Sequence, residues 1–331
     1  MSGLVKGKWV ETMPAAEEIK DGKFVRMDST FRDAVSADPD GEFPAEKGRY
    51  HLWVSYGCPW ASRTLAVRVL KGLEDVISFS AATSAFMTQG WTFAEGPDGA
   101  PSQGDGPEGY PLHRLYATAV PDYTGKATVP VLWDKKQRRI VNNESSEIIR
   151  MLNTAFDGIT GNRLDLYPEP LRAEIDRWNA FVYPNVNNGV YRAGFATTQH
   201  AYEEAVTVLF DALDTLDTHL ATNRYLAGQY CTEADWRLFT TLVRFDIAYF
   251  GAFNCNLRRI ADYPALSGYL RELYQWPGIA ATVKLDLIKS GYYSLRNVTL
   301  RGIVPVGPKV DLTSPHGRDH LPGKGIWERD A

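Results

Sequence analysis

The fold is decided by one stretch in the first quarter of the chain, Tyr50-His-Leu-Trp-Val-Ser-Tyr-Gly-Cys-Pro-Trp-Ala-Ser-Arg-Thr64. Its first six residues alternate and are rich in strand-forming types, so the sequence predicts a strand over 50–55. The segment 61–73 is predicted to be a helix. Its apolar residues fall at helical spacing, at Leu65, Ala66, Val69, Leu70 and Leu73. The turn between strand and helix contains Cys58.

Cys58 is predicted to be a reactive thiolate. The N-terminus of a helix favours negative charge, which lowers the pKa of a thiol placed there. Pro59 fits the first helical turn, because that position needs no N–H donor. The alternative is that Cys58 is a small buried apolar residue, but the sequence of strand, glycine, cysteine, proline, aromatic residue and helix argues against it. Ala61 occupies the place of a second, resolving cysteine. A single thiol forms a mixed disulfide that an outside thiol resolves, and glutathione is the abundant cytosolic candidate.

A second segment, Thr128-Val129-Pro130, leads into a strand. In thioredoxin-like folds this proline is cis, and the residue before it offers its backbone N–H and C=O to a bound peptide-like ligand. Val129 is therefore a candidate glutathione-binding residue. The alternative is an ordinary edge-strand proline.

A third segment, Asn143-Glu-Ser-Ser146, lies at the start of another predicted helix. Ser145 and the backbone N–H groups there can hold a carboxylate, and Glu144 can accept an ammonium group. Together they would bind the γ-glutamyl end of glutathione, which has both charges. The alternative is simple helix capping by Ser145 or Ser146.

These elements predict an α/β plus all-α fold, in which a thioredoxin-like N-terminal domain precedes an all-helical C-terminal domain. The thioredoxin-like sheet is expected to be mixed, and the segment 82–123 to be a long loop that replaces or displaces a short helix. Helices are expected over 201–220, from a Thr232–Asp235 capping box, over 265–274 and over 278–288. The predicted boundaries are an N-terminal arm with at most short helices at 1–47, the thioredoxin-like domain at 48–160, the helical domain at 168–293 and a tail at 294–331.

Composition limits the function. The chain has 331 residues and a formal net charge of -4, which argues against a nucleic-acid partner. It has no apolar run long enough to cross a membrane and no secretory signal at its start, so the expected location is the cytoplasm. Its three cysteines are too few for a disulfide framework. His316 and His320 are four residues apart, but the intervening Gly317 disfavours a helix, so no metal site is predicted.

The sequence resembles the glutathione transferase superfamily, with the Cys-Pro thiol site of omega-like members. It is most similar to the xi class, the glutathionyl-hydroquinone reductases, along nearly its whole length. The matching motifs are Ser55-Tyr-Gly-Cys-Pro-Trp-Ala-Ser-Arg-Thr64, Gly90-Trp91, Ala127-Thr-Val-Pro-Val-Leu-Trp-Asp134, Asn142-Asn-Glu-Ser-Ser-Glu-Ile-Ile149, Asn187-Asn-Gly-Val-Tyr-Arg-Ala-Gly-Phe195, Leu242-Val-Arg-Phe-Asp246 and Pro315-His-Gly-Arg-Asp319. The glycine-rich stretch at 94–110 matches no motif.

The resemblance implies that glutathione reduces a glutathionyl-hydroquinone, or a related aromatic, to the free hydroquinone and releases glutathione disulfide. Glutathione would be the co-substrate, and the protein a homodimer. Cys58 matches the nucleophile. The glutathione-binding positions match Trp91, Val129, Glu144 and Ser145, with Arg114 as the arginine. The tyrosines at the aromatic substrate match Tyr191, Tyr249 and Tyr292. Two alternatives remain: an omega-like thiol transferase or dehydroascorbate reductase, and a binding protein without turnover.

Overall fold

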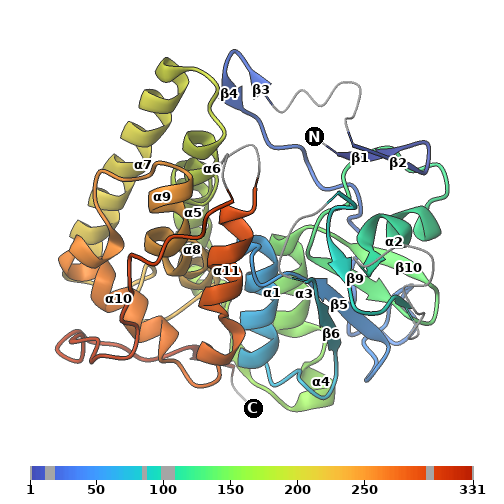
Figure 1. The fold of residues 1–331 in the computed structure, drawn as a ribbon. Helices are drawn as coiled ribbons and strands as arrows, with labels where there is room; N and C mark the ends of the chain where they lie inside the picture. Colours follow the sequence, from blue (N-terminus) through green and yellow to red (C-terminus); the bar gives the residue numbers. More distant parts are fainter. Residues whose placement is uncertain (1, 12–18, 84–87, 98–108, 296–301, 330–331) are drawn as a thin grey trace. The chain divides into compact units, whose positions relative to one another are not determined.

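The computed structural model describes residues 2–11, 19–83, 88–97, 109–295 and 302–329. The chain divides into two compact units (Figure 1). The first comprises 1–17 and 28–162, and the second comprises 18–27 and 163–331.

The first unit is built on a four-stranded mixed sheet with the strand order β10-β9-β5-β6. Its strands are β5 (Tyr50–Val54), β6 (Ser78–Ala81), β9 (Val131–Asp134) and β10 (Arg139–Asn142). The β5 strand pairs in parallel with β6 and antiparallel with β9, and β9 pairs antiparallel with β10. Because β5 lies inside the sheet, four of its five residues are buried. The mixed sheet confirms the thioredoxin-like prediction.

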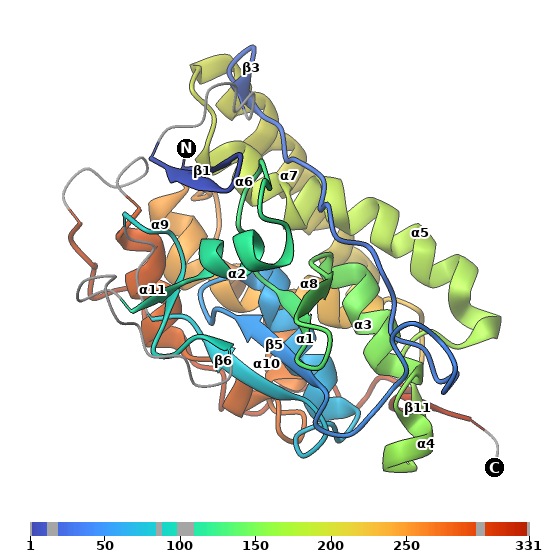
Figure 2. The ribbon, with the colours of Figure 1, turned by 90° about the vertical axis from the view of Figure 1, so that its right-hand side faces the viewer.

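The helices of the first unit are α1 (Pro59–Leu70), α2 (Leu112–Ala119), α3 (Ser145–Thr154) and α4 (Asp157–Thr160). Figures 1 and 2 show α1 and α3 side by side on one face of the sheet and α2 on the other face. The α1 helix follows β5 after a short turn, with Cys58 as its N-cap and Pro59 as its first residue. The predicted order of strand, cysteine-containing turn and helix is therefore confirmed.

The prediction of a loop over 82–123 is wrong near its C-terminal end, where the structure contains α2. This helix buries Leu112, Leu115 and Tyr116, which are three and four residues apart and so lie on one face. It is too short for its period to stand out among the surrounding glycines and prolines. Two short strands, β7 (Thr92–Phe93) and β8 (Tyr110–Pro111), pair antiparallel in the same segment. The glycine-rich residues 98–108 lie outside the described residues.

The N-terminal residues contain two hairpins rather than the predicted arm with at most short helices. Their strands are β1 (Gly3–Val5), β2 (Lys8–Val10), β3 (Ile19–Lys20) and β4 (Lys23–Phe24). Positive backbone φ angles at the Lys6-Gly7 and Asp21-Gly22 turns allow these tight reversals. The first hairpin belongs to the first unit, and the second belongs to the helical unit.

The second unit is helical, as predicted. Its α-helices are α5 (Arg172–Val182), α6 (Gly189–Gly194), α7 (Gln199–Leu220), α8 (Glu233–Arg244), α9 (Phe250–Ala252), α10 (Pro264–Tyr274) and α11 (Leu285–Tyr293). Two π-helical segments, η4 (Tyr183–Asn187) and η5 (Phe245–Tyr249), follow α5 and α8. Single 3₁₀ turns are η3 (Glu169–Leu171), η6 (Ile260–Asp262) and η7 (Ala280–Thr282). The helix expected over 278–288 is instead η7 followed by α11, because the backbone is extended at Val283 and leaves the helical conformation.

The capping box predicted at the start of α8 is present. The Asp235 carboxylate accepts hydrogen bonds from the Thr232 backbone N–H at 2.8 Å and from the Tyr269 hydroxyl at 2.7 Å. Strands β11 (Leu164–Asp165) and β12 (Trp327–Glu328) pair antiparallel, so residues 327–328 pack against the start of this unit. Across the part of the chain that the structure describes, no helix has the length and apolar character to cross a membrane.

Candidate active site

Cys58 lies at the junction of β5 and α1. Its backbone N–H donates to the Ser55 carbonyl at 3.1 Å, and its own carbonyl accepts from the Ser62 backbone N–H at 3.1 Å. The side chain is half-buried, and its Sγ lies 3.5 Å from the carbonyl oxygen of Val129. The other two cysteines, Cys231 and Cys255, are buried, and burial raises the pKa of both thiols. Cys58 is therefore the cysteine whose placement suits a nucleophile.

The Val129 backbone is held in place by a buried tyrosine. The Val129–Pro130 peptide bond is cis. The Tyr116 hydroxyl donates to the Thr128 carbonyl at 2.9 Å and accepts from the Thr128 backbone N–H at 3.2 Å. It also accepts from Nδ2 of Asn143 at 3.0 Å, so one phenol connects the cis-proline loop to the segment before α3. Tyr116 was missed from the sequence because α2 was not predicted.

Glu144 and Ser145 lie at the start of α3. Glu144 is the N-cap residue, and its carboxylate accepts hydrogen bonds from the Ser146 backbone N–H at 3.0 Å and the Ser146 hydroxyl at 2.8 Å. The Ser29 hydroxyl donates to the same carboxylate at 3.1 Å. Capping by a side chain of this segment is thus present, although the cap is Glu144 rather than a serine.

The pKa of the Glu144 carboxyl is lower than its usual value. Burial is the largest single influence and acts to raise the pKa. The hydrogen bonds from Ser146, the positive charge of Arg63 and the hydrogen bond from Ser29 outweigh it. Glu144 is therefore an ionised carboxylate at neutral pH and is suited to receive an ammonium group.

Arg63, a residue that sequence reasoning missed, connects α1 to this helix start. Its side chain is only 1% exposed, and its Nη1 donates to the Ser145 hydroxyl at 3.3 Å. The guanidinium also lies 4.5 Å from the ring centroid of Trp60. The available signal was an arginine one and a half turns after Cys58 in a helix whose other residues are mostly apolar or small.

Trp91 and Arg114, the two other residues predicted to bind glutathione, also belong to the first unit. Trp91 is half-buried next to β7, and its carbonyl accepts from the Leu112 backbone N–H at 2.8 Å. Arg114 is exposed on α2. The structure thus links Cys58 to Val129, and Arg63 links α1 to Ser145, whereas the roles of Trp91 and Arg114 stay predictions.

The three predicted tyrosines meet in the second unit. The Tyr292 hydroxyl lies 2.7 Å from the Tyr191 hydroxyl and 3.0 Å from the Tyr249 hydroxyl. Tyr249 and Tyr292 are buried, and burial raises the pKa of both phenols well above the usual value. Tyr191 is half-buried. The three phenol hydroxyls therefore form one hydrogen-bonded row, in which Tyr191 is nearest to solvent.

Two of these tyrosines lie in or just after a π-helical segment, whereas Tyr292 lies in α11. Tyr249 is the last residue of η5, and Tyr191 follows η4 within the first turn of α6. Such segments insert an extra residue into a helix and redirect the side chains that follow. Phe253 completes the packing, with its ring centroid 5.3 Å from those of both Tyr191 and Tyr249.

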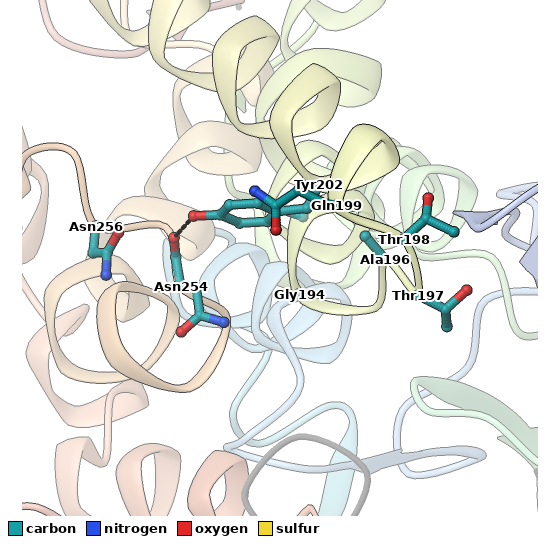
Figure 3. A pocket seen from close by; sticks show the side chains of 9 residues that line it. Gly194, Ala196, Thr197, Thr198, Gln199, Tyr202, Asn254 and Asn256 are labelled. Atoms are coloured by element: carbon teal, nitrogen blue, oxygen red, sulfur yellow. Dashed lines mark hydrogen bonds between the residues drawn. The ribbon is translucent and has the colours of Figure 1, made fainter.

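A polar pocket of about 450 Å³ lies where α6 leads into α7 (Figure 3). It is lined by Ala193, Gly194, Ala196, Thr197, Thr198, Gln199, Tyr202, Asn254 and Asn256. The Tyr202 hydroxyl donates to the backbone carbonyl of Asn254 at 2.7 Å, as Figure 3 shows. None of the predicted site residues lines this pocket. Within the described ranges, no group of three or more histidine, cysteine, aspartate or glutamate side chains could hold a metal ion.

Comparison with known proteins places the chain among characterised families. The family described as glutathione S-transferase, N-terminal domain, matches residues 57–155, and the corresponding C-terminal domain matches 199–272. Glutathionyl-hydroquinone reductase YqjG of Escherichia coli is 48% identical, and the match covers 96% of this chain and 99% of that protein.

Solved structures of glutathione transferases are also similar to this chain. A xi-class glutathione transferase from Natrialba magadii superposes with a TM-score of 0.87 at 46% identity, over 98% of both chains. The glutathione-bound structure of YqjG gives a TM-score of 0.81 at 50% identity, over 87% of this chain and 96% of that one.

Proposed function

Since the chain belongs to the glutathione transferases, and among them to the xi-class glutathionyl-hydroquinone reductases, we propose that it reduces glutathionyl-hydroquinones with glutathione, using Cys58 as the nucleophile. The net reaction is a glutathionyl-hydroquinone plus glutathione giving the free hydroquinone plus glutathione disulfide. The observation that supports this most is the half-buried thiol at the start of α1, 3.5 Å from the Val129 carbonyl.

In the first half-reaction, the Cys58 thiolate attacks the sulfur of the aryl thioether. A sulfur–sulfur bond forms, the aryl carbon–sulfur bond breaks, and the electron pair of the broken bond goes to the ring, which takes up one proton. The ring carbon is thereby reduced and the two sulfurs are oxidised to a mixed disulfide. Because an aryl carbanion is a poor leaving group, the reaction needs a ring carbon that is already protonated, as in a keto tautomer. The electron pair of the carbon–sulfur bond then moves through the ring to the carbonyl oxygen, which becomes a phenolate.

The tyrosines suit that demand. Tyr191, Tyr249 and Tyr292 are joined by hydroxyl contacts of 2.7 and 3.0 Å. Phenols that remain protonated at neutral pH can donate hydrogen bonds to a substrate oxygen as negative charge develops on it. We assign them to the aromatic substrate, with Tyr191 making the direct contact because it is the least buried of the three.

In the second half-reaction, a glutathione thiolate attacks the glutathione sulfur of the mixed disulfide. Glutathione disulfide leaves, and Cys58 departs as a thiolate, a negative charge that its position at the start of α1 favours. Val129 would pair with the peptide backbone of glutathione, whereas Ser145 and the ionised Glu144 would receive the carboxylate and ammonium of its γ-glutamyl end. Trp91 and Arg114 stay proposed as further glutathione contacts. Two half-reactions through a covalent intermediate give ping-pong kinetics.

The test is turnover of a glutathionyl-hydroquinone by wild type and Cys58→Ala, with mass analysis after the first half-reaction. Wild type should release hydroquinone and gain one glutathione, and Cys58→Ala should do neither. Cys231→Ala is the matched control, because that thiol is buried, and it should keep both properties. Turnover by Cys58→Ala would refute the mechanism.

A single thiol at this position also suits a thiol transferase acting on mixed disulfides or dehydroascorbate. A substrate panel separates the two functions, because the reductase turns over glutathionyl-hydroquinones and the thiol transferase turns over mixed disulfides or dehydroascorbate. Only the reductase reaction would need the three tyrosines. The homodimer and the cytoplasmic location stay predictions.

A further inference from the structure

The hairpin formed by β3 and β4 contributes side chains to the tyrosine cluster. The hairpin lies beside α6 in the helical unit (Figure 1). The Gly22 carbonyl accepts from the Thr197 backbone N–H at 3.0 Å. Phe24 is buried, with its ring centroid 5.3 Å from that of Phe195 and 6.5 Å from that of Tyr191. The residues that follow Phe24 are thereby fixed close to Tyr191.

Arg26 lies over the ring of Tyr191. Its guanidinium carbon is 5.0 Å from the Tyr191 ring centroid and 5.8 Å from that of Phe24. Its Nε donates to the side-chain oxygen of Asn188 at 3.1 Å, which orients the guanidinium plane.

Other cations lie near this face. Lys23 and Arg192 both pair with the Glu204 carboxylate, at 2.6 and 3.5 Å. A second cation, Arg244, is buried behind the cluster and donates to the Thr240 carbonyl at 2.7 Å. Burial raises the pKa values of Tyr249 and Tyr292, and the charge of Arg244 acts against that rise. Cations therefore flank the three phenols from two elements.

We propose that Arg26 is a positioning residue that makes the Tyr191–Tyr292 pair a site for an anionic aromatic oxygen. This inference rests on the proposed function and deepens it. When the carbon–sulfur bond of a keto-form substrate breaks, the electron pair leaves the substrate as a phenolate. The Tyr191 hydroxyl donates a hydrogen bond to that oxygen and accepts one from the Tyr292 hydroxyl 2.7 Å away. A cation over the Tyr191 ring stabilises the negative charge shared along these bonds.

Substrate selection follows from the same charge. Aromatic rings with an oxygen that ionises readily are favoured over rings whose oxygen is blocked, because a blocked oxygen cannot become anionic. The preferred substrates are glutathionyl-hydroquinones with electron-withdrawing substituents, which stabilise a phenolate.

The experiment compares binding of two probes of similar shape to resting enzyme, 4-nitrophenolate above its pKa and neutral 4-nitroanisole. The variants are Arg26→Ala and Arg26→Lys. Arg26→Ala should weaken binding of 4-nitrophenolate by about 3- to 30-fold, whereas binding of 4-nitroanisole should change less than twofold. The 4-nitrophenolate affinity of Arg26→Lys should lie between the affinities of wild type and Arg26→Ala. The matched control is Lys23→Ala, which removes a cation of the same hairpin and should leave both affinities unchanged.

Equal losses for the two probes would mean that Arg26 only shapes the site, and would overturn the inference. So would unchanged 4-nitrophenolate binding, or no 4-nitrophenolate binding by wild type. Turnover of a glutathionyl-hydroquinone by wild type is measured in parallel. Its absence would refute the proposed function, while the comparison of the two probes still decides the role of Arg26.

Discussion

The buried guanidinium of Arg63 donates to the Ser145 hydroxyl across 3.3 Å, and this contact joins the two helix starts of the proposed glutathione site. Arg63 extends from α1, which begins next to Cys58, and Ser145 is the first residue of α3. The same positive charge helps to keep Glu144 ionised. One side chain thus couples the thiol helix to the residues proposed to bind the γ-glutamyl end.

Arg63→Met should therefore weaken glutathione binding. The substitution keeps an unbranched side chain but removes the donor to Ser145 and the charge near Glu144. The expected loss is about 1–3 kcal/mol, or roughly 5- to 150-fold in the dissociation constant. Calorimetric titration with glutathione measures it.

The matched control for this prediction is Arg68→Met. Arg68 is also buried on α1, but it donates to the carbonyls of Ile77 and Glu74. Its loss should lower the stability of the fold and leave the glutathione affinity of the folded protein unchanged. If both variants lost affinity equally, Arg63 would have no particular role at this site.

Glu144 should make stability depend on acid pH. Its folded-state pKa is lower than the usual value, so its ionised form adds stability above the unfolded-state pKa, about 4.3 for glutamate. That contribution disappears as the pH falls through the lower folded-state pKa. The difference in unfolding free energy between wild type and Glu144→Gln should therefore be largest near neutral pH and shrink below about pH 4.3. Urea unfolding at a series of pH values measures it, and a difference that stays constant with pH would contradict the assigned ionisation.

The residues that sequence reasoning found lie where an element begins, because such positions are marked locally. Gly57 and Pro59 mark Cys58, Pro130 marks Val129, and a cluster of polar residues marks Glu144 and Ser145. No neighbouring glycine, proline or polar cluster distinguishes Arg63 or Tyr116 in the sequence, because their partners are brought close only by tertiary packing. The contact of Arg26 with Tyr191 could not be predicted for the same reason. The segment 18–27 is too short and polar to predict its partner, and its place in the helical unit follows from packing of Phe24 on α6 residues.

The three tyrosines should contribute unequally to the first half-reaction. Tyr191 is half-buried, whereas Tyr249 has no exposed surface. The Tyr292 hydroxyl contacts both phenols, and the rings of Tyr191 and Tyr249 meet edge to face. Tyr191→Phe should slow single-turnover release of hydroquinone about 10- to 100-fold, and Tyr249→Phe only a few-fold. Both variants should bind glutathione as wild type does. Loss of glutathione affinity in Tyr191→Phe would contradict its assignment to the aromatic substrate.

Arg318 fixes the residues around it to the helical unit. Arg318 is buried and pairs with Glu272 at 3.1 Å, and it also donates to the carbonyls of Leu220, Asn223 and Arg224 at 2.8 to 3.0 Å. These carbonyls lie at the end of α7 and just beyond it, where helical partners run out. Arg318→Ala would leave them and the buried carboxylate without this donor. Because Arg224 still pairs with Glu272 at 2.6 Å, the expected loss is about 3 kcal/mol of unfolding free energy.

Asp319→Asn is the matched control for Arg318→Ala. The Asp319 side chain is 85% exposed, and its contact with Arg224 at 3.3 Å lies at the surface. Its removal should cost at most about 0.5 kcal/mol. Urea unfolding followed by circular dichroism measures both variants. Because Arg318 lies outside the proposed site, Arg318→Ala should keep wild-type turnover per folded molecule at low temperature. A loss of turnover without a loss of stability would show instead that the C-terminal residues take part in the reaction.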